Sequence, residues 1–235
     1  MPQTMPAPPP ELRRVLDRLE TERRVSLPLL DLDVRDASGT GDGSYTLTGT
    51  AAVFNTTTTL YEGRSWVIQE RVDPGAFGEV LAALRDGLAA GDPAAAVHLN
   101  HGHDMQTAVA RLQRIGEAGP VEVGGLKLWT SARGLEVFAR LDSADPDVQA
   151  LVPKMRRGIV DQMSFAFRIG KESLYSTEDD EGRTVDLWTI EKVSALFDVC
   201  VCAQGAYPPT SAQLRSALRA ADHAGVDHVG LLHIN

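Results

Sequence analysis

The sequence predicts an α+β fold in which many strands close, or nearly close, into a β-barrel accompanied by helices. The chain has 235 residues, 43% of them hydrophobic, which is long enough for one sizeable core. Many short segments alternate apolar and polar residues, as strands do, and only a few have the apolar spacing of a helix. So many strands in one chain favour a barrel over an open sheet.

The division of the chain follows from changes in this pattern. Residues 1–26 form a polar start, in which Met1–Pro10 is rich in proline and is expected to be disordered. In Glu11–Arg24 the apolar residues lie on one helical stripe, which predicts an amphipathic helix. Residues 27–215 are expected to form the folded domain, and residues 216–235 a helical end and tail.

The strands are predicted in order along the domain. The first is indicated by the alternation of Leu30, Leu32 and Val34, and it is followed by a glycine-rich loop at Ala37–Ser44. The further candidates are Tyr45–Phe54, Ser65–Glu70, Ala96–His101, Ala108–Ile115, Leu126–Thr130, Gly134–Leu141, Ile159–Ile169, Val185–Lys192 and Leu196–Ala203.

Two helices are predicted within the domain, and a third after it. The stripe from Phe77 to Leu88 predicts one helix, which Asp73 and Pro74 are placed to start. In the second helix, Asp145 is a suitable N-cap and Gly158 a suitable end. A last apolar stripe at Ser211–Ala221 predicts a helix near the C-terminus.

Composition excludes several classes of function. The formal net charge of −9 and the pI near 5.1 oppose binding to nucleic acid, which needs a basic surface to displace counterions. No segment has the length and hydrophobicity of a membrane span, and the N-terminus lacks a signal peptide's apolar core, so we expect a cytosolic protein without membrane partners. Cys200 and Cys202 fit no zinc or redox spacing, and we expect them to be buried and reduced.

Ser164 is the candidate nucleophile. Met163, Phe165, Phe167 and Ile169 share one strand face by alternation, which leaves Ser164 on the other face among small and polar neighbours. A serine hydroxyl is a poor nucleophile at neutral pH, so catalysis requires a base within hydrogen-bonding reach and a third group to orient it.

The candidate base is His101. Three of the six histidines, His98, His101 and His103, lie close together, whereas the others lie in the C-terminal tail. Val97, Leu99 and His101 alternate on one face, so His101 should project from the end of a buried row just before Gly102 breaks the strand. We expect structural or capping roles for His98 and His103. A zinc site on the three histidines is the chemical alternative, although their spacing matches no familiar metal motif.

Several segments, taken in order, resemble the prohead maturation serine proteases of tailed phages, which are distantly similar to the herpesvirus assemblins. The likeness extends from about Leu29 to Arg215. The matching segments are Gly49–Asn55, Glu70–Phe77, Leu99–His101, Gly134–Leu135, Gly158–Phe167, Phe197–Val199 and Gly205–Thr210. The chain departs from the family pattern at Cys200, where serine is usual, and at residues 203–205, which replace a proline-led stretch.

This resemblance implies a small, mostly antiparallel β-barrel surrounded by helices, as in assemblins. Carried over to the matching positions, it makes His101 the base and Ser164 the nucleophile. Asp198 matches the acidic third member, with Glu191, Asp104 and Asp161 as rivals, while assemblins use a second histidine.

The resemblance also implies a task. Family members cleave scaffold or capsid-protein segments, and often themselves, inside assembling procapsids, here in the host bacterial cytoplasm. No metal or organic cofactor is implied, and a homodimer stays open because assemblins dimerise. Two alternatives remain: a noncatalytic procapsid scaffold or adaptor component, and a metallohydrolase built on the histidine cluster.

Overall fold

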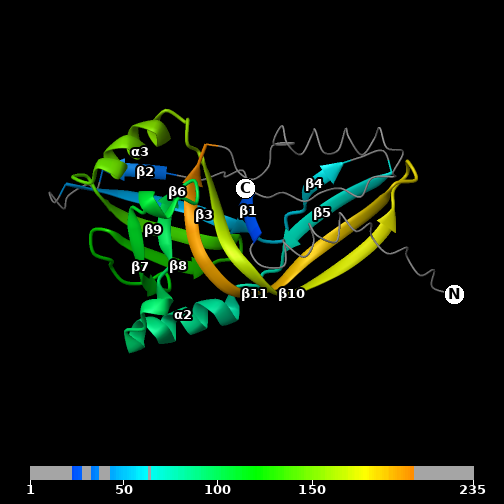
Figure 1. Cartoon of the computed structure of the whole chain (residues 1–235), viewed down its shortest axis with the longest axis horizontal. Coiled ribbons are helices and arrows are strands. Elements are labelled where there is room, and N and C mark those ends of the chain that lie inside the picture. The colour runs from blue at the N-terminus through cyan, green and yellow to red at the C-terminus, as the bar shows by residue number, and fades with distance from the viewer. Residues whose placement is uncertain (1–22, 28–32, 37–42, 63–64, 204–235) are drawn as a thin grey trace.

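The computed structural model describes residues 23–27, 33–36, 43–62 and 65–203 of the chain (Figure 1). These residues form one eleven-stranded sheet, two α-helices and two short 3-10 helices. The strands are β1 (Arg23–Leu27), β2 (Asp33–Asp36), β3 (Ser44–Val53), β4 (Thr58–Glu62), β5 (Trp66–Val72), β6 (His98–His101), β7 (Ala110–Ile115), β8 (Gly125–Thr130), β9 (Gly134–Asp142), β10 (Gln162–Glu178) and β11 (Thr184–Cys202). The helices are α2 (Gly78–Ala90), η1 (Pro93–Ala95), η2 (Met105–Thr107) and α3 (Pro146–Arg156).

The sheet is a curled half-barrel, so the predicted closed or nearly closed barrel is wrong. Its strands follow the order β1-β10-β11-β6-β7-β8-β9-β3-β2, with β5 beside β11 and β4 beside β5. Most neighbours are antiparallel, and only β11 with β5, β11 with β6 and β7 with β8 are parallel. Within the described residues no ladder joins β1 to β2, the two ends of this order.

The strands β10 and β11 extend beyond the curled part of the sheet. They have 17 and 19 residues. β11 pairs with β5 along residues 184–190 and with β6 along residues 198–201. One half of the long hairpin therefore belongs to the curled sheet, and the other half projects from it with β4 and β5 (Figure 1).

Most predicted strands are confirmed, with different boundaries. The two segments predicted at 185–192 and 196–203 are one continuous strand, β11, and β10 continues to Glu178 through polar residues that hid it. β1 and β4 were not predicted. The helix expected at 11–24 lies outside the described residues except for Arg23 and Arg24, which begin β1.

Other expectations also concern parts of the chain outside the described residues, among them Met1–Pro10, most of the loop at Ala37–Ser44 and the tail at residues 216–235. Residues 28–32 of the first predicted strand lie outside the described residues, and β2 follows them. The segment Gly205–Thr210 and the helix predicted at Ser211–Ala221 lie outside as well.

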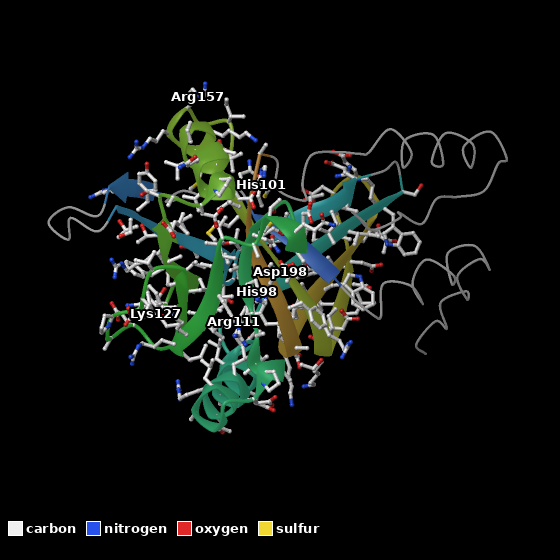
Figure 2. The ribbon with its side chains drawn as sticks, turned by 60° about the vertical axis from the view of Figure 1, so that its left-hand side comes forward. His98, His101, Arg111, Lys127, Arg157 and Asp198 are labelled. Carbon is white, nitrogen blue, oxygen red and sulfur yellow. The ribbon has the colours of Figure 1, made fainter. Side chains whose placement is uncertain are left out.

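The two α-helices lie at opposite ends of the curled half-barrel (Figure 1, Figure 2). α3 begins as predicted: the Asp145 carboxylate accepts a 2.8 Å hydrogen bond from the Asp147 backbone N–H, and Pro146 occupies the first turn. Gly158, at φ 66°, lets the chain turn toward β10. No helix in the described ranges is long and apolar enough to cross a membrane.

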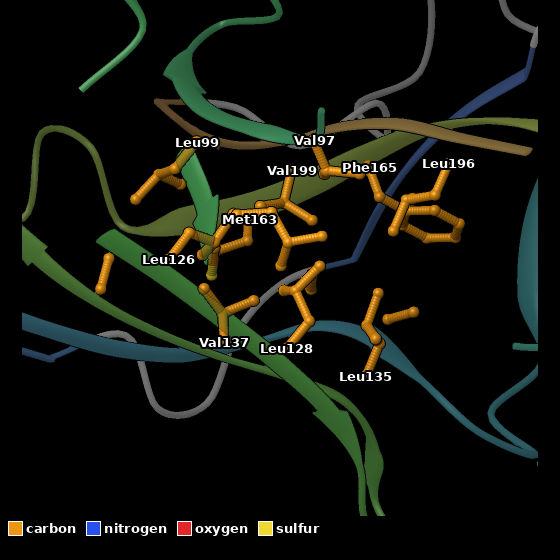
Figure 3. Packing of buried hydrophobic residues seen from close by; sticks show 14 of the residues in the cluster. Val97, Leu99, Leu126, Leu128, Leu135, Val137, Met163, Phe165, Leu196 and Val199 are labelled. Carbon is orange, nitrogen blue, oxygen red and sulfur yellow. The ribbon is translucent and has the colours of Figure 1, made fainter. Parts of the chain in front are cut away.

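The core lies inside the curl of the sheet (Figure 3). Met163, Phe165 and Phe167 of β10 belong to this core and Ile169 packs against it, as their alternation predicted, although Ser164 on the other face is also buried. Phe165 packs edge-on against Phe77, with ring centroids 5.5 Å apart, so the segment leading into α2 shares this core. Because β10 is anchored through these residues, the position and direction of Ser164 are well determined.

Gly134, at the start of β9, lies where the sheet is tightly packed against the backbone of β3. A Cβ atom on Gly134 would lie 1.7 Å from the Ala52 carbonyl oxygen of β3, so the backbone would have to move. We expect Gly134→Ala to lower the free energy of unfolding by about 3 kcal/mol, measured by urea denaturation followed by circular dichroism.

Gly78→Ala is the matched control, because a Cβ atom there meets no neighbour within 4 Å and Gly78 begins α2. This substitution should cause no loss of stability, and a gain of up to about 1 kcal/mol is expected. Equal unfolding free energies for the two variants would contradict the packing described here.

Candidate active site

Three neighbouring strands present one common face at the site. In the ladder, Ser164 of β10 lies opposite Cys200 of β11, which lies opposite Asn100 of β6. The next row on the same face contains Ala166, Asp198 and His98. Directly opposite residues point to the same side of a sheet, so this face carries the polar side chains while the other contributes to the core.

The turn after β6 brings His103 back over this face. Gly102 and His103 both have positive φ, at 69° and 61°, and the Asp104 N–H donates to the His101 carbonyl at 3.3 Å. Two central residues with positive φ are the mark of a type I′ turn. Positive φ is uncommon for residues other than glycine, although histidine tolerates it better than most.

Buried Asn100 and the side chain of Thr107 hold this turn. The Asn100 Oδ1 atom accepts a 3.1 Å hydrogen bond from the His103 N–H, and Asn100 has no exposed surface. Thr107 Oγ1 donates to the carbonyls of His101 and Asp104, at 3.1 and 2.9 Å. These contacts stabilise a backbone conformation that would otherwise be costly, which is typical of functional sites.

The His103 imidazole bridges Ser164 and Asp198. Its Nε2 atom lies 2.8 Å from Ser164 Oγ, and its Nδ1 atom lies 2.6 Å from Asp198 Oδ1. A carboxylate can only accept, so Nδ1 carries the proton, and Nε2 is left to accept from the serine hydroxyl. This is the chain of hydrogen bonds that a serine nucleophile, its base and the orienting carboxylate require.

The histidine beside Ser164 is therefore His103, and not His101 as expected. His101 pairs with Val201 and lies, by alternation, on the core side of β6 with Leu99. Its hydrogen bonds are made by its backbone. Burial, followed by the charge of Lys154 from α3, lowers the pKa of its imidazole.

Asp198 is the carboxylate that contacts the histidine, and its three predicted rivals lie in other environments. Asp104 caps η2 by accepting from the Gln106 N–H at 2.9 Å. Glu191 is paired with Lys171 on the outer part of the hairpin. Asp161 is exposed just before β10 begins.

The histidine cluster does not converge as metal ligands would. Within the described ranges, no three His, Cys, Asp or Glu side chains are grouped closely enough to hold a metal ion. His98 lies beside Asp198, and His101 lies nearer α3 (Figure 2). Burial, followed by the charge of Arg111, lowers the pKa of His98, so this side chain is predominantly neutral at pH 7.

Cys200 adjoins the site but is a poor rival to Ser164 as nucleophile. Both Cys200 and Cys202 are free and buried, as predicted. A side-chain hydrogen bond with Cys202, followed by burial, raises the pKa of the Cys200 thiol. The reactive form of cysteine is the thiolate, which this environment disfavours.

A groove of about 610 Å³ opens beside the site between α2, η1 and β11. His103 and Asp198 form part of its wall, together with apolar side chains such as Leu84, Leu196 and Phe197. Ser164 does not line this groove, and its exposed fraction is 0%.

His103 was missed because a tight turn interrupts the alternation on which the sequence interpretation depended. By alternation along β6, the His101 side chain lies on the same side of the sheet as Leu99, whereas Ser164 lies on the other side. The two side chains therefore cannot meet. The signal that pointed to His103 was Gly102, which indicated a reversal of the chain directly before it.

One of three comparisons with known proteins gives a match. No curated protein and no solved structure matches the chain, so the predicted likeness to the assemblin fold stays a prediction. The caudovirus prohead serine protease family matches residues 30–224, which include Ser164, His103 and Asp198. The match covers most of the chain and agrees with the resemblance seen in its motifs. The chain therefore belongs to the caudovirus prohead serine protease family.

Proposed function

We propose that this protein is the endopeptidase of phage head maturation, with Ser164 as nucleophile, His103 as general base and Asp198 as the group that orients His103. The observation that supports the assignment best is the placement of one imidazole within hydrogen-bonding distance of both a serine hydroxyl and a buried carboxylate. These three residues come from strands and a turn that are far apart in the sequence.

The reaction would proceed by acyl transfer. His103 Nε2 takes the proton from Ser164 as Oγ attacks the scissile carbonyl, and Asp198 stabilises the imidazolium that results. The imidazolium then protonates the leaving amine as the peptide bond breaks. Water, deprotonated by His103, hydrolyses the acyl-enzyme and regenerates the serine.

The substrates we propose are segments of the major capsid protein and of the scaffold, and the protease chain itself. The family description, which refers to proheads, supports this choice. The protein would act inside the assembling procapsid in the host bacterial cytoplasm. Its chemistry would be carried by side chains alone, without a metal or organic cofactor.

Ser164→Ala should reduce the rate of peptide hydrolysis by at least about 10³-fold, because it removes the nucleophile but little packing volume. Hydrolysis of fluorescein-labelled casein and labelling by a fluorophosphonate would measure the loss. Ser173→Ala is the matched control, since Ser173 is exposed farther along β10 and should leave both rates unchanged. Undiminished hydrolysis by Ser164→Ala would disprove the assignment of the nucleophile.

His103→Ala and His101→Ala separate the two candidate bases. We expect His103→Ala to lower kcat/KM by about 10²- to 10⁴-fold, because the base that activates the serine is lost. His101→Ala should change kcat/KM by less than about threefold, since its imidazole lies on the other side of β6. Melting temperatures would show that both variants are folded, and the reverse order of effects would restore His101 as the base.

Asp198→Asn tests the orienting carboxylate. An amide in this position can donate to Nδ1 and so favours the imidazole tautomer with its proton on Nε2, which cannot accept from Ser164. We expect kcat to fall by about 10⁴-fold with a smaller change in KM. Glu191→Gln is the matched control, and a loss of activity confined to this control would show that Asp198 has no part in the reaction.

A further inference from the structure

The catalytic strand β10 is paired on both edges near Ser164. One edge is hydrogen-bonded to β11, and the other is hydrogen-bonded to β1. β1 runs antiparallel to β10, in a register that places Arg23 opposite Phe167, Ser26 opposite Ser164 and Leu27 opposite Met163. A short segment from the N-terminal part of the chain thus lies alongside the strand that carries Ser164.

The nucleophile is inaccessible in this arrangement. Ser164 has an exposed fraction of 0%, and the groove beside His103 and Asp198 does not reach it. The three side chains are within hydrogen-bonding distance of one another, yet Ser164 presents no surface to solvent. The described form therefore combines an assembled site with a covered nucleophile.

The covered edge has the properties of a peptide-binding site. In the order of the sheet, β1 is one of the two end strands, and within the described residues its only ladder is with β10. Without β1, the outer edge of β10 would present unpaired N–H and C=O groups around Ser164. An edge of this kind binds an extended peptide as an added strand, with affinity supplied by backbone hydrogen bonds.

We propose that the outer edge of β10 is the binding site for the substrate backbone, and that β1 occupies it as an internal competitor. The proposal rests on the role of Ser164 put forward above. The ligand is an extended peptide segment that pairs antiparallel to residues 163–167. The residue that takes the place of Ser26 lies opposite Ser164, so the scissile bond lies next to that residue.

Internal competition makes cleavage depend on substrate concentration. A tethered segment competes at an effective concentration on the order of 1 mM when the connection allows it to reach its site. A substrate segment must match that concentration, or bind more tightly, to displace β1. Dilute peptides are then cleaved slowly, and segments packed together at high local concentration are cleaved efficiently.

The test measures peptide binding in full-length chains that carry Ser164→Ala, so that no cleavage occurs. The probe is a fluorescein-labelled peptide with the sequence of residues 21–29, and binding is followed by fluorescence anisotropy. Val25→Pro should lower the Kd of the peptide at least about tenfold, because by the alternation of the ladder the Val25 N–H faces β10, and proline removes this donor from the pairing of β1. Val25→Gly, a milder change, should have an intermediate effect.

Ala7→Pro is the matched control, since it adds a proline to a segment that already contains several, and it should leave the Kd unchanged. A scrambled peptide of the same composition should bind each chain more weakly. Equal Kd values in the chains with and without the β1 substitutions would overturn the proposal, as would the absence of binding to all of them. The milder Val25→Gly variant provides the result if Val25→Pro does not fold.

A second readout separates this proposal from the proposed function. In chains that retain Ser164, Val25→Pro should increase the rate of fluorophosphonate labelling at least about tenfold, because the hydroxyl becomes accessible when β1 is released. Tighter peptide binding without labelling in any chain would support the binding edge and contradict the catalytic role of Ser164. If all chains that retain Ser164 are labelled at the same rate, this result would support the catalytic role of Ser164 and overturn the role of β1 as a competitor.

Discussion

The parallel ladder between β6 and the C-terminal half of β11 is the constraint on which the candidate site depends. It pairs Asp198 with His98 and Cys200 with Asn100, although these segments are about a hundred positions apart in the chain. Because β10 is the other neighbour of β11, the same ladder places the turn after β6 over Ser164. Without it, neither the carboxylate nor the imidazole would lie near the serine.

The site is rigid where its chemistry requires fixed distances. His103 lies in a turn with positive φ, held by a hydrogen bond to a fully buried amide, Asn100. Met163 and Phe165, on either side of Ser164, are anchored in the core. The histidine and the serine are thus fixed from opposite sides of the sheet, which limits the freedom that would weaken their hydrogen bond.

The open sheet bears on access to Ser164, the proposed nucleophile. A closed barrel would pair every strand on both edges, whereas a half-barrel leaves terminal strands. The outer edge of β10, next to Ser164, is where such a terminal strand is added. A strand edge beside a nucleophile can receive a substrate, and for the same reason it can receive a segment of its own chain. Under the proposal made above, access to the site is a competition between two peptides for the same backbone groups.

The sequence alone determined features that depend on neighbouring residues. Alternation around Ser164 predicted its face of β10, the Asp145 cap and Gly158 predicted α3, and the ordered motifs predicted the family. Only the tertiary structure decided which histidine meets Ser164, because a two-residue turn reverses the chain and strand parity does not extend across it. The open form of the sheet and the pairing of β1 with β10 also depend on contacts between distant segments, which local patterns do not encode.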